Sequence, residues 1–210
     1  EPVKLDGKLY TALEKAASCG RYLYCEPVYE YYRSMFSCNY DYEIYDFDAL
    51  TNPELAAEFS EILSFANDAA EIDLQFGEDN TVVLRVSDEY IGFAKTHDIY
   101  CFTGLGVMKN AFIIDYLADG MTDGGYISGY INSADGYCRN MLTDSTQFSL
   151  NLFDMNDNTV NLIGTMHYTA PSSIVSLRSY PIDRSAKAMY YISEDGRIRS
   201  PFIDMADGIS

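Results

Sequence analysis

The chain has 210 residues and a formal net charge of −18, from 14 Lys and Arg against 32 Asp and Glu. This acidic excess argues against a nucleic-acid partner and against docking on anionic lipid, because both need a cationic surface. A hydrophobic content of 48% indicates a folded globular protein, and no apolar run approaches the ~20 residues that span a bilayer, so no transmembrane segment is expected.

Three helices are predicted in the first third of the chain. Asp6 can cap a helix that ends near Gly20, and the apolar residues between them recur every three or four positions. Pro27 opens a second helical pattern. Asn52 followed by Pro53 supplies the cap and first turn of a third.

The apolar period drops to two after residue 71, which predicts a β-hairpin over 72–86 with its turn at 77–80. A helix is expected after Gly106, stopping around Gly120, and a strand over 126–132 enters a turn at 133–136. Further strands are predicted at 147–153, 159–167, 173–178, 189–192 and 198–203. Early helices, a hairpin, one central helix and then many strands indicate an α+β fold with mixed or antiparallel sheets. No linker or repeat divides the chain, so a single domain is expected.

Two motifs are candidate ligand sites. Gly104-Leu105-Gly106 resembles the start of a phosphate-binding loop, and the helix amides that follow could hold an anion; plain turn glycines are the alternative. Residues 154–158 have the alternating oxygen ligands of a calcium loop but lack its glycine and bidentate glutamate, so a hairpin turn is favoured. Asp119 and Asp123 could approach a cation, although solvated helix-end carboxylates are the usual case.

Tyrosines, histidines and cysteines give weaker signals. The 19 tyrosines include a dense group between residues 22 and 45, which predicts either a packing face, the favoured interpretation, or a sugar-stacking surface. Residues 38–48 have no clear period and are interpreted as a loop or a short strand. Five cysteines without regular spacing indicate reduced, mostly buried thiols. The two histidines support neither a metal site nor a nucleophilic triad.

In chain order, four segments resemble motifs of the FAD:protein FMN transferase (ApbE-type) family. The family's ALELAxxSxGRFD is similar to ALEKAASCGRY at 12–22, and its GAIAKGYAVD fits GVMKNAFIID at 106–115. The family strand that ends in NLGGD resembles residues 126–136, with Asn132 in register. The family's DGKRYHHILDPKTG fits DGRIRSPFIDMADG at 195–208. The resemblance covers nearly the whole chain.

The resemblance implies an ApbE-like, T-fold-related domain over residues 1–210, without the family's N-terminal segment and its C-terminal metal motif. Its activity would be the Mg²⁺-dependent transfer of FMN from FAD to a Thr or Ser of an acceptor protein. The cofactor-binding candidates are Gly106, Val107, Asn110, Asn132 and Asp204. The resemblance also implies an extracytoplasmic location, periplasmic or at a bacterial cell surface, although the first residues carry no signal-peptide pattern.

The departures from the family fall on its reactive positions. Its paired histidines are Ser200 and Pro201 here, and neither can act as a general base near neutral pH. Its lysine is Asn110, and the neighbouring Lys109 would point about 100° away on a helix. This pattern predicts a retained fold with lost or altered catalysis, so no catalytic and no metal residue is assigned.

Three hypotheses about function are open at this point. In the favoured one, the protein no longer transfers FMN but keeps a flavin or nucleotide cleft between the Gly106 helix and the turn after Asn132. In the second, it is an active transferase in which Lys109 or Asp204 has a replacement role. In the third, it is a non-enzymatic extracytoplasmic module that binds a protein or glycan through its acidic, Tyr-rich first third.

Overall fold

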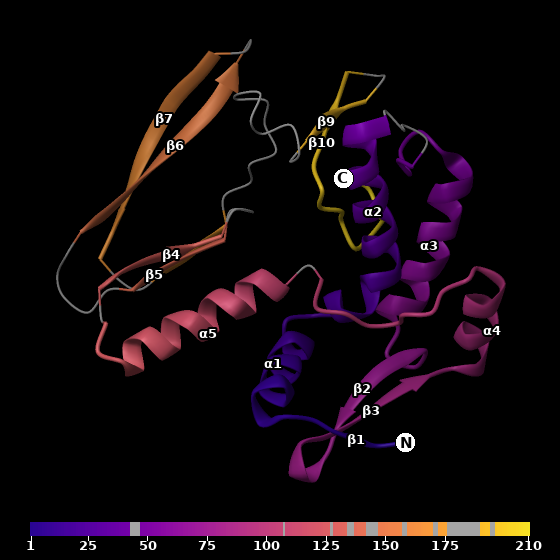
Figure 1. Cartoon of the computed structure of the whole chain (residues 1–210). Helices are drawn as coiled ribbons and strands as arrows, with labels where there is room; N and C mark the ends of the chain where they lie inside the picture. Colours follow the sequence, from indigo (N-terminus) through magenta and orange to yellow (C-terminus); the bar gives the residue numbers. More distant parts are fainter. Residues whose placement is uncertain are drawn as a thin grey trace. The chain divides into compact units, whose positions relative to one another are not determined.

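The structure is a computed structural model that describes residues 1–42, 47–106, 108–126, 128–133, 137–141, 147–156, 159–169, 172–175, 190–193 and 196–210. The chain forms two compact units, one of residues 1–108 with 201–210 and one of residues 109–200. Helices and small antiparallel sheets make up both units (Figure 1), which confirms the α+β class. The ApbE-like fold and the single domain stay predictions.

Unit 1 is built on helices that begin where the sequence predicts. The α-helices of its described residues are α1 (Gly7–Ser18), α2 (Glu26–Tyr42), α3 (Pro53–Asn67) and α4 (Asp88–Thr96), with the 3-10 helices η1 (Tyr22–Cys25) and η2 (Glu78–Asn80) between them. The Asp6 carboxylate accepts a bond from the Lys8 amide at 2.9 Å, and Asn52 accepts from two amides of the first turn of α3. All three predicted helices are therefore confirmed.

Two helical features differ from the expectation. α2 continues to Tyr42, so the loop or short strand expected from residue 38 is wrong there, and residues 43–46 lie outside the described part. A buried face that includes Val28 and Tyr32 stabilises this helix, and such packing overrides the weak helix propensity of Tyr and Asp. α4 was not predicted, although Ser87 caps it by accepting a bond from the Tyr90 amide at 2.9 Å.

The core of unit 1 lies where α2 and α3 run side by side above η1 (Figure 1). Leu23, Val28, Phe59 and Leu63 are at most 2% exposed there. Tyr24, Tyr29 and Tyr32 are buried in this core, whereas Tyr22 and Tyr31 remain exposed. Among the tyrosines of this group whose side chains are described, three of five therefore pack in the core, in line with the favoured interpretation.

Arg21 connects the helical core to the sheet of unit 1. Its Nε donates a bond to the Ala66 carbonyl at 2.7 Å, and its Nη2 donates to the carbonyls of Asp68 and Ile72. The same guanidinium lies 4.2 Å from the centre of the Tyr24 ring. A single cation therefore satisfies backbone carbonyls at the end of α3 and the start of the next strand.

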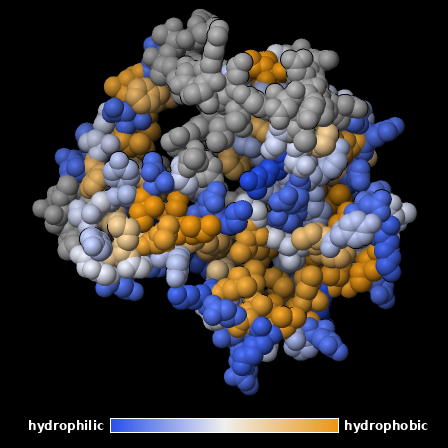
Figure 2. Space-filling model, in the orientation of Figure 1, coloured by the Kyte–Doolittle hydropathy of each residue, from blue (hydrophilic) through white to orange (hydrophobic). Residues whose placement is uncertain are grey.

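That sheet contains the predicted hairpin. It consists of β1 (Val3–Lys4), β2 (Ile72–Phe76) and β3 (Thr81–Val86), in the order β1-β3-β2, with all pairs antiparallel. Leu74 pairs with Leu84, so the alternating apolar residues of both strands share one face. Apolar surface gathers over the region of α1 and this hairpin in Figure 2, where Leu9 and Leu84 are partly exposed.

Unit 2 contains one helix and most of the strands. Its described elements are α5 (Lys109–Asp123), β4 (Gly129–Asn132), β5 (Tyr137–Met141), β6 (Phe148–Asn156), β7 (Thr159–Tyr168), β8 (Ser172–Val175), β9 (Tyr191–Ile192) and β10 (Ile198–Arg199). The sheets have the orders β4-β5-β8, β6-β7 and β9-β10, and all pairs are antiparallel. α5 packs against β5.

The strand predictions for unit 2 hold in outline. Asn156 pairs with Thr159, so β6 and β7 form a hairpin, in line with the interpretation favoured over a calcium loop, and residues 157 and 158 of that segment lie outside the described residues. α5 runs past Gly120, because glycine inside a helix costs only about 1 kcal/mol relative to alanine. The strand expected at 198–203 ends at Arg199, β5 was not predicted, and residues 134–136 of the expected turn lie outside the described residues. No helix in the described part of the chain is long and apolar enough to cross a membrane.

Gly208 is a position where unit 1 requires glycine. Its φ is +73°, and a Cβ there would lie 2.8 Å from Cδ2 of Phe59. We expect Gly208→Ala to lower the free energy of unfolding by roughly 1–3 kcal/mol, because it adds backbone strain to a steric overlap. Urea unfolding measures the change. The matched control is Gly92→Ala in α4, where no atom apart from the neighbouring backbone of the helix lies within 4 Å of the new Cβ. Helix propensity predicts that this substitution raises the free energy of unfolding by up to about 1 kcal/mol. Equal effects of the two substitutions would contradict the argument.

Candidate functional site

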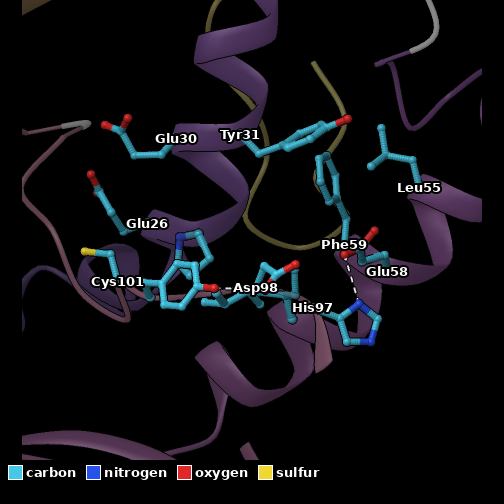
Figure 3. Close-up of a pocket in the computed structure, with 13 residues that line it drawn as sticks. Glu26, Glu30, Tyr31, Leu55, Glu58, Phe59, His97, Asp98 and Cys101 are labelled. Atoms are coloured by element: carbon cyan, nitrogen blue, oxygen red, sulfur yellow. Dashed lines mark hydrogen bonds and ion pairs between the residues drawn. The ribbon is translucent and has the colours of Figure 1, made fainter. Parts of the chain in front are cut away.

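A pocket of about 320 Å³ opens in unit 1 between α2, α3 and the segment that follows α4 (Figure 3). Its lining comes from three separate stretches of sequence: Glu26, Pro27, Glu30 and Tyr31; Leu55, Glu58, Phe59 and Ile62; and His97, Asp98, Ile99, Tyr100 and Cys101. All of them belong to the same compact unit, so the geometry of the pocket is that of unit 1 alone.

Aromatic rings form one part of this lining. Tyr31 and Phe59 meet edge to face, with ring centres 5.7 Å apart and an interplanar angle of 81°. Phe59 is buried against Gly208, whereas Tyr31 is 43% and Tyr100 86% exposed. The pocket therefore has a fixed apolar base and two aromatic side chains that solvent and a ligand can reach.

Carboxyl groups form the other part. Glu26, Glu30, Glu58 and Asp98 all line the pocket, and none of the described lining residues is a lysine or an arginine. His97 Nδ1 lies 3.1 Å from Glu58 Oε1, and the Tyr100 hydroxyl donates a bond to Asp98 Oδ1 at 2.9 Å. Both contacts are drawn in Figure 3, where Glu26 and Glu30 lie on the side away from His97. The site is thus electronegative as well as apolar.

Glu26 joins this pocket to the glycine motif at 104–106. Its side chain is 7% exposed, and its Oε2 accepts a bond from the Gly106 amide at 3.2 Å. A Cβ on Gly104 would overlap the Glu26 carboxyl group, and a Cβ on Gly106 would lie 2.7 Å from Oε1. The glycines are therefore needed for a close approach between backbone and carboxyl group, which the turn interpretation did not foresee.

The surroundings of Glu26 favour its protonated form. Burial raises the pKa of this carboxyl group, and a hydrogen bond to Glu30 together with repulsion from it acts in the same direction. The hydrogen bond from the Gly106 amide and the charge of Arg33 lower this pKa, but to a smaller extent. The result is a buried acidic group with a raised pKa, directly on the wall of the pocket.

Two further groups nearby are perturbed by burial. It raises the pKa of the Cys25 thiol and that of the Tyr90 hydroxyl, each to about 12. The four cysteines whose side chains are described are free thiols, as expected. Only Cys25 of these four is buried, whereas Cys138 is half-buried and Cys19 and Cys101 are exposed, so the expectation of mostly buried thiols is wrong for them. Cys19 follows the last residue of α1, and Cys101 lies in the segment after α4.

The predicted cofactor residues divide between the two units. Gly106 lies beside Glu26 and Tyr29, and Val107 lies outside the described residues. Asp204 forms a C-terminal turn, in which its Oδ1 accepts a bond from the Ala206 amide and its carbonyl accepts from Gly208. The remaining two candidates are in unit 2, Asn110 in the first turn of α5 and Asn132 at the end of β4.

Within unit 1, neither Gly106 nor Asp204 lines the pocket. Gly106 contacts one lining residue, Glu26. Gly208, which closes the turn of Asp204, packs against another, Phe59. Sequence reasoning missed the cavity because Glu58, Asp98 and Tyr100 belong to no recognisable motif.

Within the residues whose side chains are placed, no group of three or more His, Cys, Asp or Glu could hold a metal ion. Asp119 and Asp123 of α5 accordingly form no such group. Comparison with known protein families, with curated proteins and with solved structures found no match.

The raised pKa of Glu26 makes a prediction about stability. A carboxyl group whose pKa is higher in the folded state binds its proton more tightly there, so stability falls as the pH rises above its ordinary value of 4.5. We expect Glu26→Gln, which keeps an acceptor for the Gly106 amide, to be more stable than the unchanged protein at pH 8. The difference should vanish below about pH 4. Urea unfolding across this range tests it, with exposed Glu61→Gln of α3 as the control. A Glu26→Gln protein less stable at pH 8 would refute the argument.

Proposed function

We propose that this chain is an ApbE-like protein that binds a flavin but no longer transfers FMN to an acceptor protein. The ordered motif resemblance supports the family, and Asn110, Ser200 and Pro201 at the reactive positions support the loss of transfer. An extracytoplasmic location in a bacterium belongs to the same proposal. The observation that carries the binding role is the contact between the Gly106 amide and the Glu26 carboxyl group.

In that contact, the carboxyl oxygen stands in for an oxygen of a phosphate group. The Gly106 N–H already points at a carboxyl oxygen, and the two glycines leave the room that such an oxygen needs. A phosphate oxygen in the same place would receive the same donor. Glu26 thus occupies the place in which we propose that a diphosphate oxygen of FAD binds, and binding requires this side chain to move.

Electrostatics then set the condition for binding. A diphosphate at the loop would face Glu26 and Glu30 on a chain with a net charge of −18. The described residues offer no cluster for a resident metal, so we propose that Mg²⁺ arrives bound to the FAD. Its charge would offset the repulsion, while the Gly106 amide orients one phosphate oxygen.

The loss of transfer has a direct assay. The protein is incubated with FAD, Mg²⁺ and a flavin-acceptor protein, and the acceptor is examined by in-gel fluorescence. We expect no fluorescent acceptor band under conditions in which an active transferase of the family labels it. A missing general base alone slows such a reaction about 10²- to 10⁴-fold. A clear band would support the hypothesis of an active transferase, and Lys109→Ala and Asp204→Asn would then show which residue has the replacement role.

The binding role has a separate test. We expect FAD to raise the melting temperature of the protein in the presence of Mg²⁺ and to leave it unchanged in EDTA. At pH 8, Glu26→Gln should strengthen FAD binding roughly fivefold, because glutamine cannot carry the negative charge that Glu26 takes on beside the diphosphate when the pH exceeds its raised pKa. Glu61→Gln, the control on α3, should not change it. If FAD binds neither the unchanged protein nor Glu26→Gln in the presence of Mg²⁺, the flavin proposal fails, whatever the result of the transfer assay.

The alternative function, a non-enzymatic extracytoplasmic module for a protein or glycan, is favoured by one observation. Tyr31 and Tyr100 are exposed at the pocket, although Tyr29 and Tyr32 are buried. We propose that a module of this kind would use the pocket, where these two exposed rings lie.

A further inference from the structure

We infer that the pocket between α2, α3 and residues 97–101 binds an organic cation, an ammonium or guanidinium group carried on an apolar body. This ligand class differs from the flavin of the preceding proposal, and the inference does not depend on it. It follows from the charge, the aromatic lining and the size of the cavity.

The charged groups that line the pocket determine the sign of the ligand's charge. Four carboxyl groups and one imidazole line the cavity. Even with Glu26 protonated and His97 charged, the three other carboxylates outnumber the single positive charge. An entering anion would be repelled, whereas a cation would gain charge-assisted hydrogen bonds to carboxylate oxygens.

The aromatic groups add to this preference. The negative face of a tyrosine ring attracts a cation within about 6 Å, and the effect grows when water is excluded. Tyr31 is held edge to face against buried Phe59, and the Tyr100 hydroxyl is tied to Asp98. Two tyrosine rings therefore line the same cavity as the carboxyl groups, a combination that suits an ammonium or guanidinium group.

The apolar side chains account for the rest of the ligand. Leu55, Phe59 and Ile62 from α3 offer aliphatic and aromatic contacts in the same cavity. A volume of about 320 Å³ is at the small end of the range of ligand sites. A cavity of this size can hold a short arylalkyl or alkyl amine, or the side chain of one basic residue. It is too small for a larger part of a folded partner protein.

The test uses three ligands of similar shape and different charge: 2-phenylethylamine, which is cationic at neutral pH, 2-phenylethanol and 3-phenylpropionate. Amide chemical shifts of the full chain are followed during each titration. We expect saturable shifts at pocket residues for the amine, at least threefold weaker binding of the alcohol and no binding of the carboxylate. A fourth arm, N-acetyl-lysine methylamide, distinguishes a protein side chain from a free amine as the source of the cation.

Two conservative variants separate charge from shape. Asp98 has a φ of +55°, which asparagine also tolerates, so Asp98→Asn keeps the backbone and the acceptor for Tyr100 while it removes the charge. We expect Asp98→Asn and Glu30→Gln each to weaken amine binding about threefold, and Glu61→Gln outside the pocket to leave it unchanged. A higher salt concentration should weaken the binding of the amine and leave the binding of the alcohol unchanged.

The outcomes are decisive in either direction. Amine binding that falls in both charge variants, with their folds shown intact by their spectra, supports the inference. Equal affinity for amine and alcohol, tighter binding of the carboxylate, or no binding of either amine probe overturns it. FAD with Mg²⁺ is titrated separately, so a failure of the flavin proposal and a failure of this inference are distinguishable.

Discussion

The hydrogen bond between the Gly106 amide and the buried Glu26 carboxyl group is the contact on which the candidate site depends. It holds the segment after α4 against the start of α2, and it requires glycine at both 104 and 106. Because the carboxyl group is buried, its charge is costly, and its pKa is raised. The same group faces the pocket. Protonation, loop position and ligand charge are therefore coupled at one side chain.

The elements that the sequence predicts are those with strong local signals. Asp6 and Asn52 are capping residues with their helices directly after them, and the hairpin at 72–86 has a strict period of two. α4 had comparable signals in Ser87 and the acidic residues after it, and attention to the cap would have found it. β5 had none: Tyr137–Met141 mixes polar and apolar residues, and its pairing with β4 and β8 defines it.

The candidate site was less predictable than the fold, for a physical reason. Motif reasoning singled out Gly106 and Asp204, which do not line the pocket, although Gly106 contacts the lining residue Glu26. A pocket of this kind is made by tertiary packing of three distant stretches, and no spacing along the chain encodes it. The sequence shows the acidic excess, but not the pocket at which we infer that this charge selects a cationic ligand.

Cysteine chemistry follows from the way the thiols are distributed. Cys25 is closed to reagents by burial and by a thiol pKa near 12, whereas Cys101 is exposed and lines the pocket. Its Sγ–H donates to the Thr103 carbonyl at 3.2 Å, so the sulfur has a defined position. With Cys19, Cys38 and Cys138 replaced by serine, a maleimide dye at Cys101 would report on the cavity from its own wall. The chain thus carries a built-in attachment point for an optical probe of occupancy.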